Sequence, residues 1–400
     1  MIDDSLLAAM QQTLDERPGL FDRMATWITL DRAHRYLAAL ESVSAPSQTV
    51  RWTRAPVVES LLREDGLLDA PRVVWHRDLA GSGNAALLLG RDPHRKRVWL
   101  LGHLDQISYL VDPGEGDRYP LMPLCYHMQQ EGRRPAVALA HNLRQGALVV
   151  QARGVIAVEN SSVFFVVREG GPLGPGTRVV YDSRLTWDSE SNELTGYLDD
   201  SLACTAMLLA AGVLRHYAVE ALFGFTDEEE GPPGDANQSF GRGGRRLLDL
   251  FARPELAIAS DVHESQRMTR GPGPRDLQPG DGAVFAERSS NGRGSVTPPH
   301  LYALQQHLAA ALSQRDIRLH ENWGGYVARS EDINAVAVTP NVALLGVLCS
   351  NRHYALDRPA ANLADVLDLA KSFVAYSLLV DSALWRELIG PPAQTYAGTA

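Results

Sequence analysis

Five short segments of this 400-residue chain carry imidazole and carboxylate side chains, and four of them directly follow a predicted strand. The first is His103 with Asp105, after the apolar run Val98–Leu101. Residues two apart on an extended chain point to the same side. Asp105 could therefore hold one nitrogen of the His103 ring while the other nitrogen binds a metal. A His beside an Asp is also commonplace on protein surfaces, so this pair needs partners from elsewhere in the chain.

The second segment, Asp199 and Asp200, opens a predicted helix over Ser201–His216. Two acids at that position could simply cap the helix and interact favourably with its dipole. Alternatively, one of them could bridge two cations, because a carboxylate has two oxygen atoms to share. The residue types alone leave both interpretations open.

The third segment places four consecutive acids, Asp227 to Glu230, after the predicted strand Ala221–Phe225. Neighbouring carboxylates repel one another unless they are solvated or balanced by cations. A solvated acidic loop is one interpretation. The apolar strand that precedes the acids favours another, in which at least one of them points to the edge of the sheet.

The remaining two segments also end apolar strands. Asp261 follows Leu256–Ser260, with His263 close behind it, and His353 follows Val342–Cys349. A carboxylate at the end of a buried parallel strand needs a partner. Because ligands collect at the carboxyl edge of a parallel sheet, we expect these segments to meet there.

The elements that position these segments alternate between helix and strand from residue 201 onward. Such alternation predicts a mostly parallel or mixed sheet flanked by helices, an α/β fold. Residues 1–70 show helical spacing of apolar residues, whereas the stretch from about 135 to 198 is dominated by strand signals. We therefore predict an α/β domain over 1–108 and 190–390, with extra N-terminal helices over 1–40, a small β-rich insert domain over 109–189 and a disordered tail over 391–400.

The composition limits the classes of function. With 38 basic and 48 acidic residues the net charge is −10, which disfavours nucleic acid as a partner. Three widely spaced cysteines, Cys125, Cys204 and Cys349, form neither a disulfide framework nor a CxxC zinc site, and this fits a reducing compartment. The acidic N-terminus lacks the pattern of a secretory signal, and no apolar run approaches the ~18 residues of a membrane span. We expect a cytoplasmic protein without a membrane partner.

In chain order the five segments read His, Asp, Glu-Glu, Asp, His. This order resembles the dinuclear metallopeptidases that share the aminopeptidase and carboxypeptidase α/β fold. The β-rich stretch between His103 and Asp199, with the segments LLGHLDQI and GYLDD, is similar to the TET-type aminopeptidases, which include glutamyl and deblocking enzymes. The lid-bearing family of carboxypeptidases and deacylases carries its extra domain after the Asp or Glu ligand instead. The resemblance covers roughly residues 50–385, although the last His comes earlier than in the family's usual Arg-Tyr-x-His.

The resemblance implies a role for each of the singled-out residues. Asp199 would bridge two metal ions, His103 and His353 would each bind a different ion, Glu229 and Asp261 would complete the ligand sets, Glu228 would be the general base, and Asp105 would support catalysis through His103. The pattern Glu-Glu-x-Gly sets this register when it is counted back from Gly231. A shift by one residue would make Glu229 the base and Glu230 the ligand, and the sequence leaves that alternative open.

The function implied by the resemblance is hydrolysis of N-terminal residues from short peptides by water that two divalent ions activate. Mixed imidazole and carboxylate ligands suit Zn²⁺, and also Co²⁺ or Mn²⁺. The resemblance further implies a homo-oligomer that assembles through the insert domain. Two alternatives stay open: a metallo-amidohydrolase or deacylase similar to the lid-bearing family, and a non-catalytic, peptidase-like binding protein with a decayed site.

Overall fold

A computed structural model of the chain describes residues 2–124, 131–231, 241–264, 277–292, 294–323, 326, 330–354 and 357–390. Cys125 and the predicted tail over 391–400 lie outside the described residues. Within the described part, no helix combines the length and the apolar character needed to cross a bilayer.

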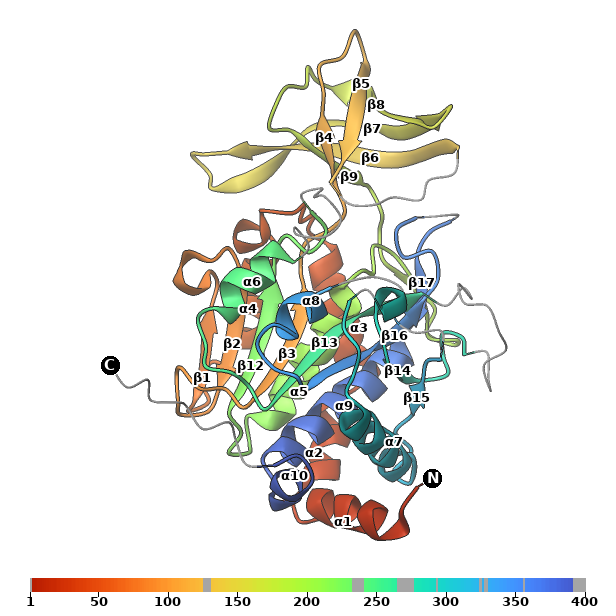
Figure 1. Ribbon diagram of the computed structural model, residues 1–400. Coiled ribbons are helices and arrows are strands. Elements are labelled where there is room, and N and C mark those ends of the chain that lie inside the picture. The colour runs from red at the N-terminus through yellow and green to blue at the C-terminus, as the bar shows by residue number, and fades with distance from the viewer. Residues whose placement is uncertain are drawn as a thin grey trace.

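A mixed sheet of eight strands forms the centre of the larger part of the molecule (Figure 1). Its central strands run parallel to one another, and the outer pairs are antiparallel except for the last. The predicted fold class is therefore confirmed. In spatial order the strands are β1 (Val73–His76), β2 (Ala85–Leu89), β12 (Ala221–Thr226), β3 (Val98–His103), β13 (Leu256–Glu264), β16 (Val342–Cys349), β14 (Ala283–Ala286) and β15 (Leu319–Glu321).

The parallel strands β12, β3, β13 and β16 bring the predicted segments to one edge of the sheet. Thr226 at the end of β12 pairs with His103 at the end of β3, and Asp261 of β13 pairs with Gly346 of β16. The strands are fully buried, which explains their apolar sequences. A polar side chain at their carboxyl ends therefore emerges among other strand ends rather than in solvent.

Helices cover both faces of this sheet (Figure 1). Alternate strand residues divide between the two faces: Leu100 packs into the large core on one side, while Trp99 and Leu101 pack on the other. The second face carries α6 (Arg242–Leu248) and α8 (Asp332–Ala335). The helices that contribute to the large core are α1 (Asp4–Asp15), α2 (Leu20–Trp27), α3 (Leu30–Glu41), α4 (Arg54–Glu64), α5 (Ser201–Leu214), α7 (Pro299–Ser313), α9 (Leu363–Val380) and α10 (Ala383–Leu388).

Every residue of α5 is buried, because this helix lies between the sheet and the helices α2, α3 and α9. Its sequence is apolar on all sides, as a central helix requires. Gly212 lets the indole of Trp27 approach the helix closely: a Cβ at this position would lie 1.8 Å from Trp27 Nε1.

We expect Gly212→Ala to destabilise the protein. Ala normally stabilises a helix by about 0.5–1 kcal/mol relative to Gly, but overpacking of a filled core costs about 1–3 kcal/mol, so the clash with Trp27 outweighs the helical gain. Urea unfolding would measure the difference. The double variant Gly212→Ala with Trp27→Leu should recover most of the loss, and a single variant as stable as the wild type would contradict this packing argument.

A closed barrel of six antiparallel strands stands on the carboxyl edge of the sheet (Figure 1). Gly154 lies near the middle of its longest strand. A Cβ at this position would lie 2.1 Å from the carbonyl oxygen of Val166, so the residue must be glycine for the strand to continue through it. The strands are β4 (Tyr109–Val111), β5 (Arg118–Pro123), β6 (Gly132–Asn142), β7 (Ala147–Glu159), β8 (Ser162–Gly170) and β9 (Arg178–Tyr181).

A small three-stranded sheet follows the barrel in the chain. It consists of β10 (Thr186–Trp187), β11 (Glu193–Thr195) and β17 (Ala360–Asn362). Its strand β17 pairs with the segment that leads from the barrel back to Asp199. The loop that carries His353 is thereby connected to the residues that precede α5.

Candidate metal centre

His103, Asp199 and His353 form the middle of a buried cluster at the carboxyl edge of the sheet. Nε2 of His103 lies 3.2 Å from Oδ1 of Asp199, and Nε2 of His353 lies 3.1 Å from Oδ2 of the same carboxylate. The three residues come from the end of β3, the turn before α5 and the loop after β16. One carboxylate therefore presents one oxygen to each of two imidazoles.

Three further acids complete the cluster. Nε2 of His103 lies 3.8 Å from a carboxylate oxygen of Glu229 and 3.9 Å from one of Asp261, whereas Nε2 of His353 lies 3.1 Å from Oε1 of Glu230. Three sets of side chains have ligand atoms within 4.8 Å of one another: His103, Glu229 and Asp261; His103, Asp199 and Glu230; and Asp199, Asp200 and Asp261.

Glu228 points away from this cluster. Its carboxylate accepts a hydrogen bond from the guanidinium of Arg246, on α6. The backbone of Glu228 has φ = +63°, a conformation that turns the chain between Asp227 and Glu229. Of the consecutive acids, the structure therefore brings Glu229 and Glu230 to the two imidazoles and directs Glu228 elsewhere.

Asp105 lies beneath the acidic loop. The sequence predicts that the Asp105 side chain holds a nitrogen of His103, but the nearer group is the Asp105 carbonyl oxygen, 3.1 Å from Nδ1, while the carboxylate lies 3.6 Å from that nitrogen. The carboxylate itself accepts hydrogen bonds from the backbone N–H groups of Glu229 and Glu230, at 3.2 and 3.1 Å, and from the hydroxyl of Ser47 at 2.6 Å. It therefore orients the loop as well as the ring.

The acids of the cluster carry more negative charge than their surroundings can solvate. Burial raises the pKa of Glu229 well above its usual value, and the carboxylates of Glu230 and Asp261 raise it further. Burial also raises the pKa values of Asp200 and Asp261. Oδ2 of Asp200 is buried and has no hydrogen-bond partner. Such a concentration of buried carboxylates is costly without compensating cations.

The negative charge of these carboxylates also changes the pKa values of the two imidazoles. Burial disfavours a charged ring, but the carboxylates of Glu229 and Asp199 outweigh this effect and raise the pKa of His103. The pKa of His353 rises to about 10 because Glu230 and Asp199 likewise outweigh its burial. Without a metal, protonated imidazoles supply the counter-charge. A divalent cation would replace those protons with its own charge.

The structure adds three neighbours that the sequence analysis did not predict as site residues. The guanidinium of Arg352 lies 4.0 Å from Asp199, and the hydroxyl of Tyr326 donates a hydrogen bond to Asp261. The His263 ring stacks on Tyr326, and its Nε2 is buried without a partner. Burial and the charge of Arg352 lower the pKa of His263 to about 3. The adjacency of Arg352 to His353 was visible in the sequence, whereas no spacing signal connects Tyr326 with Asp261.

Behind the cluster, Glu331 is buried with one oxygen bonded to the hydroxyl of Thr226 and the other without a partner. Burial raises its pKa to about 8, against the effect of that hydrogen bond. The folded chain therefore keeps a proton on Glu331 that the unfolded chain releases above its ordinary pKa of 4.5. This group's contribution to stability consequently falls as the pH rises from 4.5 to 8.

We expect Glu331→Gln to remove that pH dependence. Relative to the wild type, the free energy of unfolding of the variant should increase by up to about 1.4 kcal/mol per pH unit between pH 5 and 8. The difference between the two proteins should be constant above about pH 8. Urea unfolding of both proteins across this pH range would measure it. Parallel pH profiles would show that Glu331 does not hold its proton in the folded chain.

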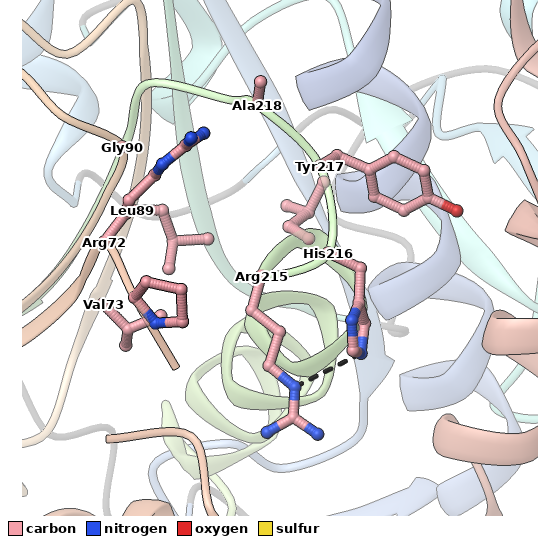
Figure 2. Close-up of a pocket in the computed structure, with 10 residues that line it drawn as sticks. Arg72, Val73, Leu89, Gly90, Arg215, His216, Tyr217 and Ala218 are labelled. Carbon is pink, nitrogen blue, oxygen red and sulfur yellow. Dashed lines mark hydrogen bonds between the residues drawn. The ribbon is translucent and has the colours of Figure 1, made fainter. Parts of the chain in front are cut away.

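A separate cavity of about 350 Å³ lies at the other end of α5 (Figure 2). It is lined in part by Arg72, Leu89, Arg215 and His216. The Arg215 Nε group donates a hydrogen bond to His216 Nε2 at 3.4 Å, drawn in Figure 2. Fourteen residues of helix separate this end of α5 from the end next to Asp199, a distance of about 21 Å. The cavity is therefore not part of the metal centre.

Solved structures with the same architecture include several aminopeptidases. The aminopeptidase from the archaeon Desulfurococcus kamchatkensis matches with a TM-score of 0.65 over 91% of this chain and 99% of its own, at 16% identity. A TET aminopeptidase from a marine sediment Thaumarchaeota archaeon matches with a TM-score of 0.66 over 90% and 99%, at 14% identity. The chain has the fold of the TET aminopeptidases. A TET peptidase from Pyrococcus horikoshii matches with a TM-score of 0.64 over 86% and 99%, at 16% identity.

The TET aminopeptidase fold thus spans almost the whole of each neighbour and most of this chain. The Pyrococcus horikoshii peptidase is described as assembling into a tetrahedron or a large octahedral shell. No family model matches the sequence, and no curated protein matches it. With identities of 14–16%, these neighbours establish the fold of this chain.

Proposed function

We propose that this chain is a metal-dependent aminopeptidase that removes N-terminal residues from short peptides. The observation that carries the proposal is the Asp199 carboxylate, whose two oxygens face His103 and His353 separately, at 3.2 and 3.1 Å. A carboxylate between two imidazoles, each with a further acid, is the ligand arrangement for a pair of cations. The shared fold with known aminopeptidases supports the same conclusion.

The residues fit two divalent ions in number and chemistry. His103, Asp199 and Asp261 would hold one ion, and Asp199, Glu230 and His353 would hold the other. The orphaned Oδ2 of Asp200 and the raised pKa values of the buried acids support a site that needs added positive charge. Imidazole and carboxylate ligands suit Zn²⁺, Co²⁺ or Mn²⁺. Bound ions would lower the pKa of water and polarise the peptide carbonyl.

Glu229 is the side chain that we propose as the general base. Its carboxylate lies beside His103 rather than between the two imidazoles, and burial raises its pKa well above the usual value for Glu, the direction that favours a general base. It would accept the proton of the attacking water and deliver it to the leaving amine. Glu228, the base in the first register counted from Gly231, bonds Arg246 instead. This geometry favours the register in which Glu229 is the base and Glu230 the ligand.

We further propose that the protein works as a homo-oligomer. One TET neighbour is described as a dodecamer and another as assembling into a tetrahedron or a large octahedral shell, and closed symmetric assemblies are the common outcome for soluble homo-oligomers. Exposed apolar side chains on the barrel, such as Leu143 and Val150, fit a contact made by that part of the chain. Analytical ultracentrifugation would measure the copy number.

Metal analysis combined with kinetics tests the function. The purified protein is expected to hold about two divalent ions per chain and to hydrolyse aminoacyl amides, with activity lost on chelation and restored by metal. N-acetylated versions of the same substrates separate the alternatives: an aminopeptidase should reject them, and a deacylase should cleave the acyl group. Absence of both bound metal and metal-dependent turnover would instead indicate a non-catalytic, peptidase-like protein.

A further inference from the structure

A buried ion pair lies behind the metal centre, in a segment that supplies none of the proposed ligands. Nη2 of Arg54 is 2.8 Å from Oε1 of Glu41, and the two side chains are 0% and 1% exposed. Glu41 ends α3, and Arg54 begins α4. Neither residue lies within one of the segments singled out from the sequence.

Glu41 holds the segment that carries Asp199. Oε2 of Glu41 accepts a hydrogen bond from the backbone N–H of Tyr197 at 2.9 Å. Oε1 accepts one from the hydroxyl of Ser201 at 2.6 Å. Tyr197 and Ser201 each lie two positions from Asp199, one before it and one after it. The carboxylate of Glu41 therefore fixes both ends of the turn that presents the proposed bridging ligand.

Arg54 holds the segment that carries His103. Its Nη1 donates a hydrogen bond to the carbonyl oxygen of Leu104 at 3.2 Å, and Leu104 lies between His103 and Asp105. Its Nε donates to the carbonyl oxygen of Leu40 at 3.1 Å, next to Glu41 in α3. Through Arg54 and Glu41, the segment of the first imidazole is connected to the segment of the bridging carboxylate.

Stability alone is a poor explanation for this pair. Burying two charges costs several kcal/mol per ion, and a well-packed apolar pair of similar volume is often equally stable. An apolar pair could not bond the Tyr197 N–H, the Ser201 hydroxyl and the Leu104 carbonyl at once. The ion pair therefore fixes the relative positions of the two loops, which apolar packing could not do.

We propose that the Glu41–Arg54 ion pair positions His103 and Asp199 for metal binding, and so sets the affinity of the site that these two residues share. The inference rests on the proposed function, because it requires that the two residues bind metal. Outer groups that orient metal ligands typically change metal affinity by roughly 10–100-fold. Both residues are buried and act through the ligands, as positioning residues.

The test is the Co²⁺ affinity of the full-length protein, measured by competition with a chromophoric chelator, together with the visible absorption spectrum of the bound Co²⁺. Arg54→Met and Glu41→Gln are expected to weaken Co²⁺ binding by roughly 10–100-fold and to alter the spectrum. Arg54→Lys should also bind Co²⁺ more weakly, because one ammonium cannot reproduce the divergent donors of the guanidinium. Glu41→Gln is nearly isosteric and decides the question if Arg54→Met does not fold.

The matched control is Lys96→Met. Lys96 is 1% exposed, and its ammonium lies 2.9 Å from the Glu220 carboxylate. Lys96 precedes β3, so the pair lies at the opposite end of this strand from His103. Loss of this pair should lower the melting temperature but leave the Co²⁺ affinity unchanged. Wild-type affinity in Glu41→Gln and Arg54→Lys, or an equal loss in Lys96→Met, would overturn the positioning role. A wild-type protein that binds no Co²⁺ would instead refute the proposed metal centre itself.

Discussion

Glu229→Gln is expected to retain metal and lose turnover. The amide keeps the size and the burial of the side chain but cannot accept the proton of the attacking water, and general base catalysis contributes about 10²–10⁴-fold. We expect kcat to fall by that factor on an aminoacyl amide, with the metal content still near two ions per chain. Steady-state kinetics and metal analysis of the same preparation would measure both quantities.

Glu228→Gln is the matched comparison for this prediction. The Glu228 carboxylate bonds Arg246 on α6, so its replacement should change kcat less than tenfold. The two variants have the same chemistry at adjacent positions, and they therefore test the register directly. Loss of turnover in Glu228→Gln with activity preserved in Glu229→Gln would restore the register counted from Gly231.

Asp199→Asn is expected to remove metal from both sites. The two Asp199 oxygens face His103 and His353 separately, and an amide provides one neutral oxygen in place of two charged ones. Metal content should fall from about two ions per chain to one or fewer. Activity should fall by ~10³-fold or more, because the electrostatic contribution of metal ions amounts to several kcal/mol. Metal analysis after dialysis and kinetics in excess metal would measure the two effects.

Asp365→Asn serves as the control for Asp199→Asn. Asp365 is also buried, and its carboxylate accepts hydrogen bonds from the N–H groups of Gly280 and Gly282, away from the metal centre. This variant should lose stability but not metal. If Asp199→Asn still binds two ions with near wild-type activity, Asp199 does not bridge them.

Much of the fold could be predicted from local sequence. The strand Val342–Cys349 has the predicted bounds, because it is a continuous apolar run between polar residues. The strands β14 and β15 were not predicted. They have four and three residues, and such short runs carry little periodicity of their own. Their pairing partners at the edge of the sheet decide their structure.

Some features of the site can likewise be predicted from local sequence, whereas others depend on contacts between distant segments. The sequence shows which residues interrupt the apolar runs of the central strands: His103 at the end of β3, Asp261 within β13 and a run of acids after β12. Strand ends are readable because a polar residue interrupts an apolar run, and parallel pairing brings such ends together. That principle is sufficient to predict a cluster of metal ligands at one edge of the sheet.

Contacts between distant segments, rather than local sequence, fix which of the consecutive acids faces the imidazoles and what holds them there. Adjacent residues in a loop have no fixed periodicity, so the direction of Glu228 depends on its backbone and on Arg246, which comes from another element. The contacts of Glu41 with Tyr197 and Ser201 connect residues more than 150 positions apart. Burial and hydrogen bonding between distant segments leave no pattern of spacing in one sequence, and the orientation of the ligands is determined by those interactions.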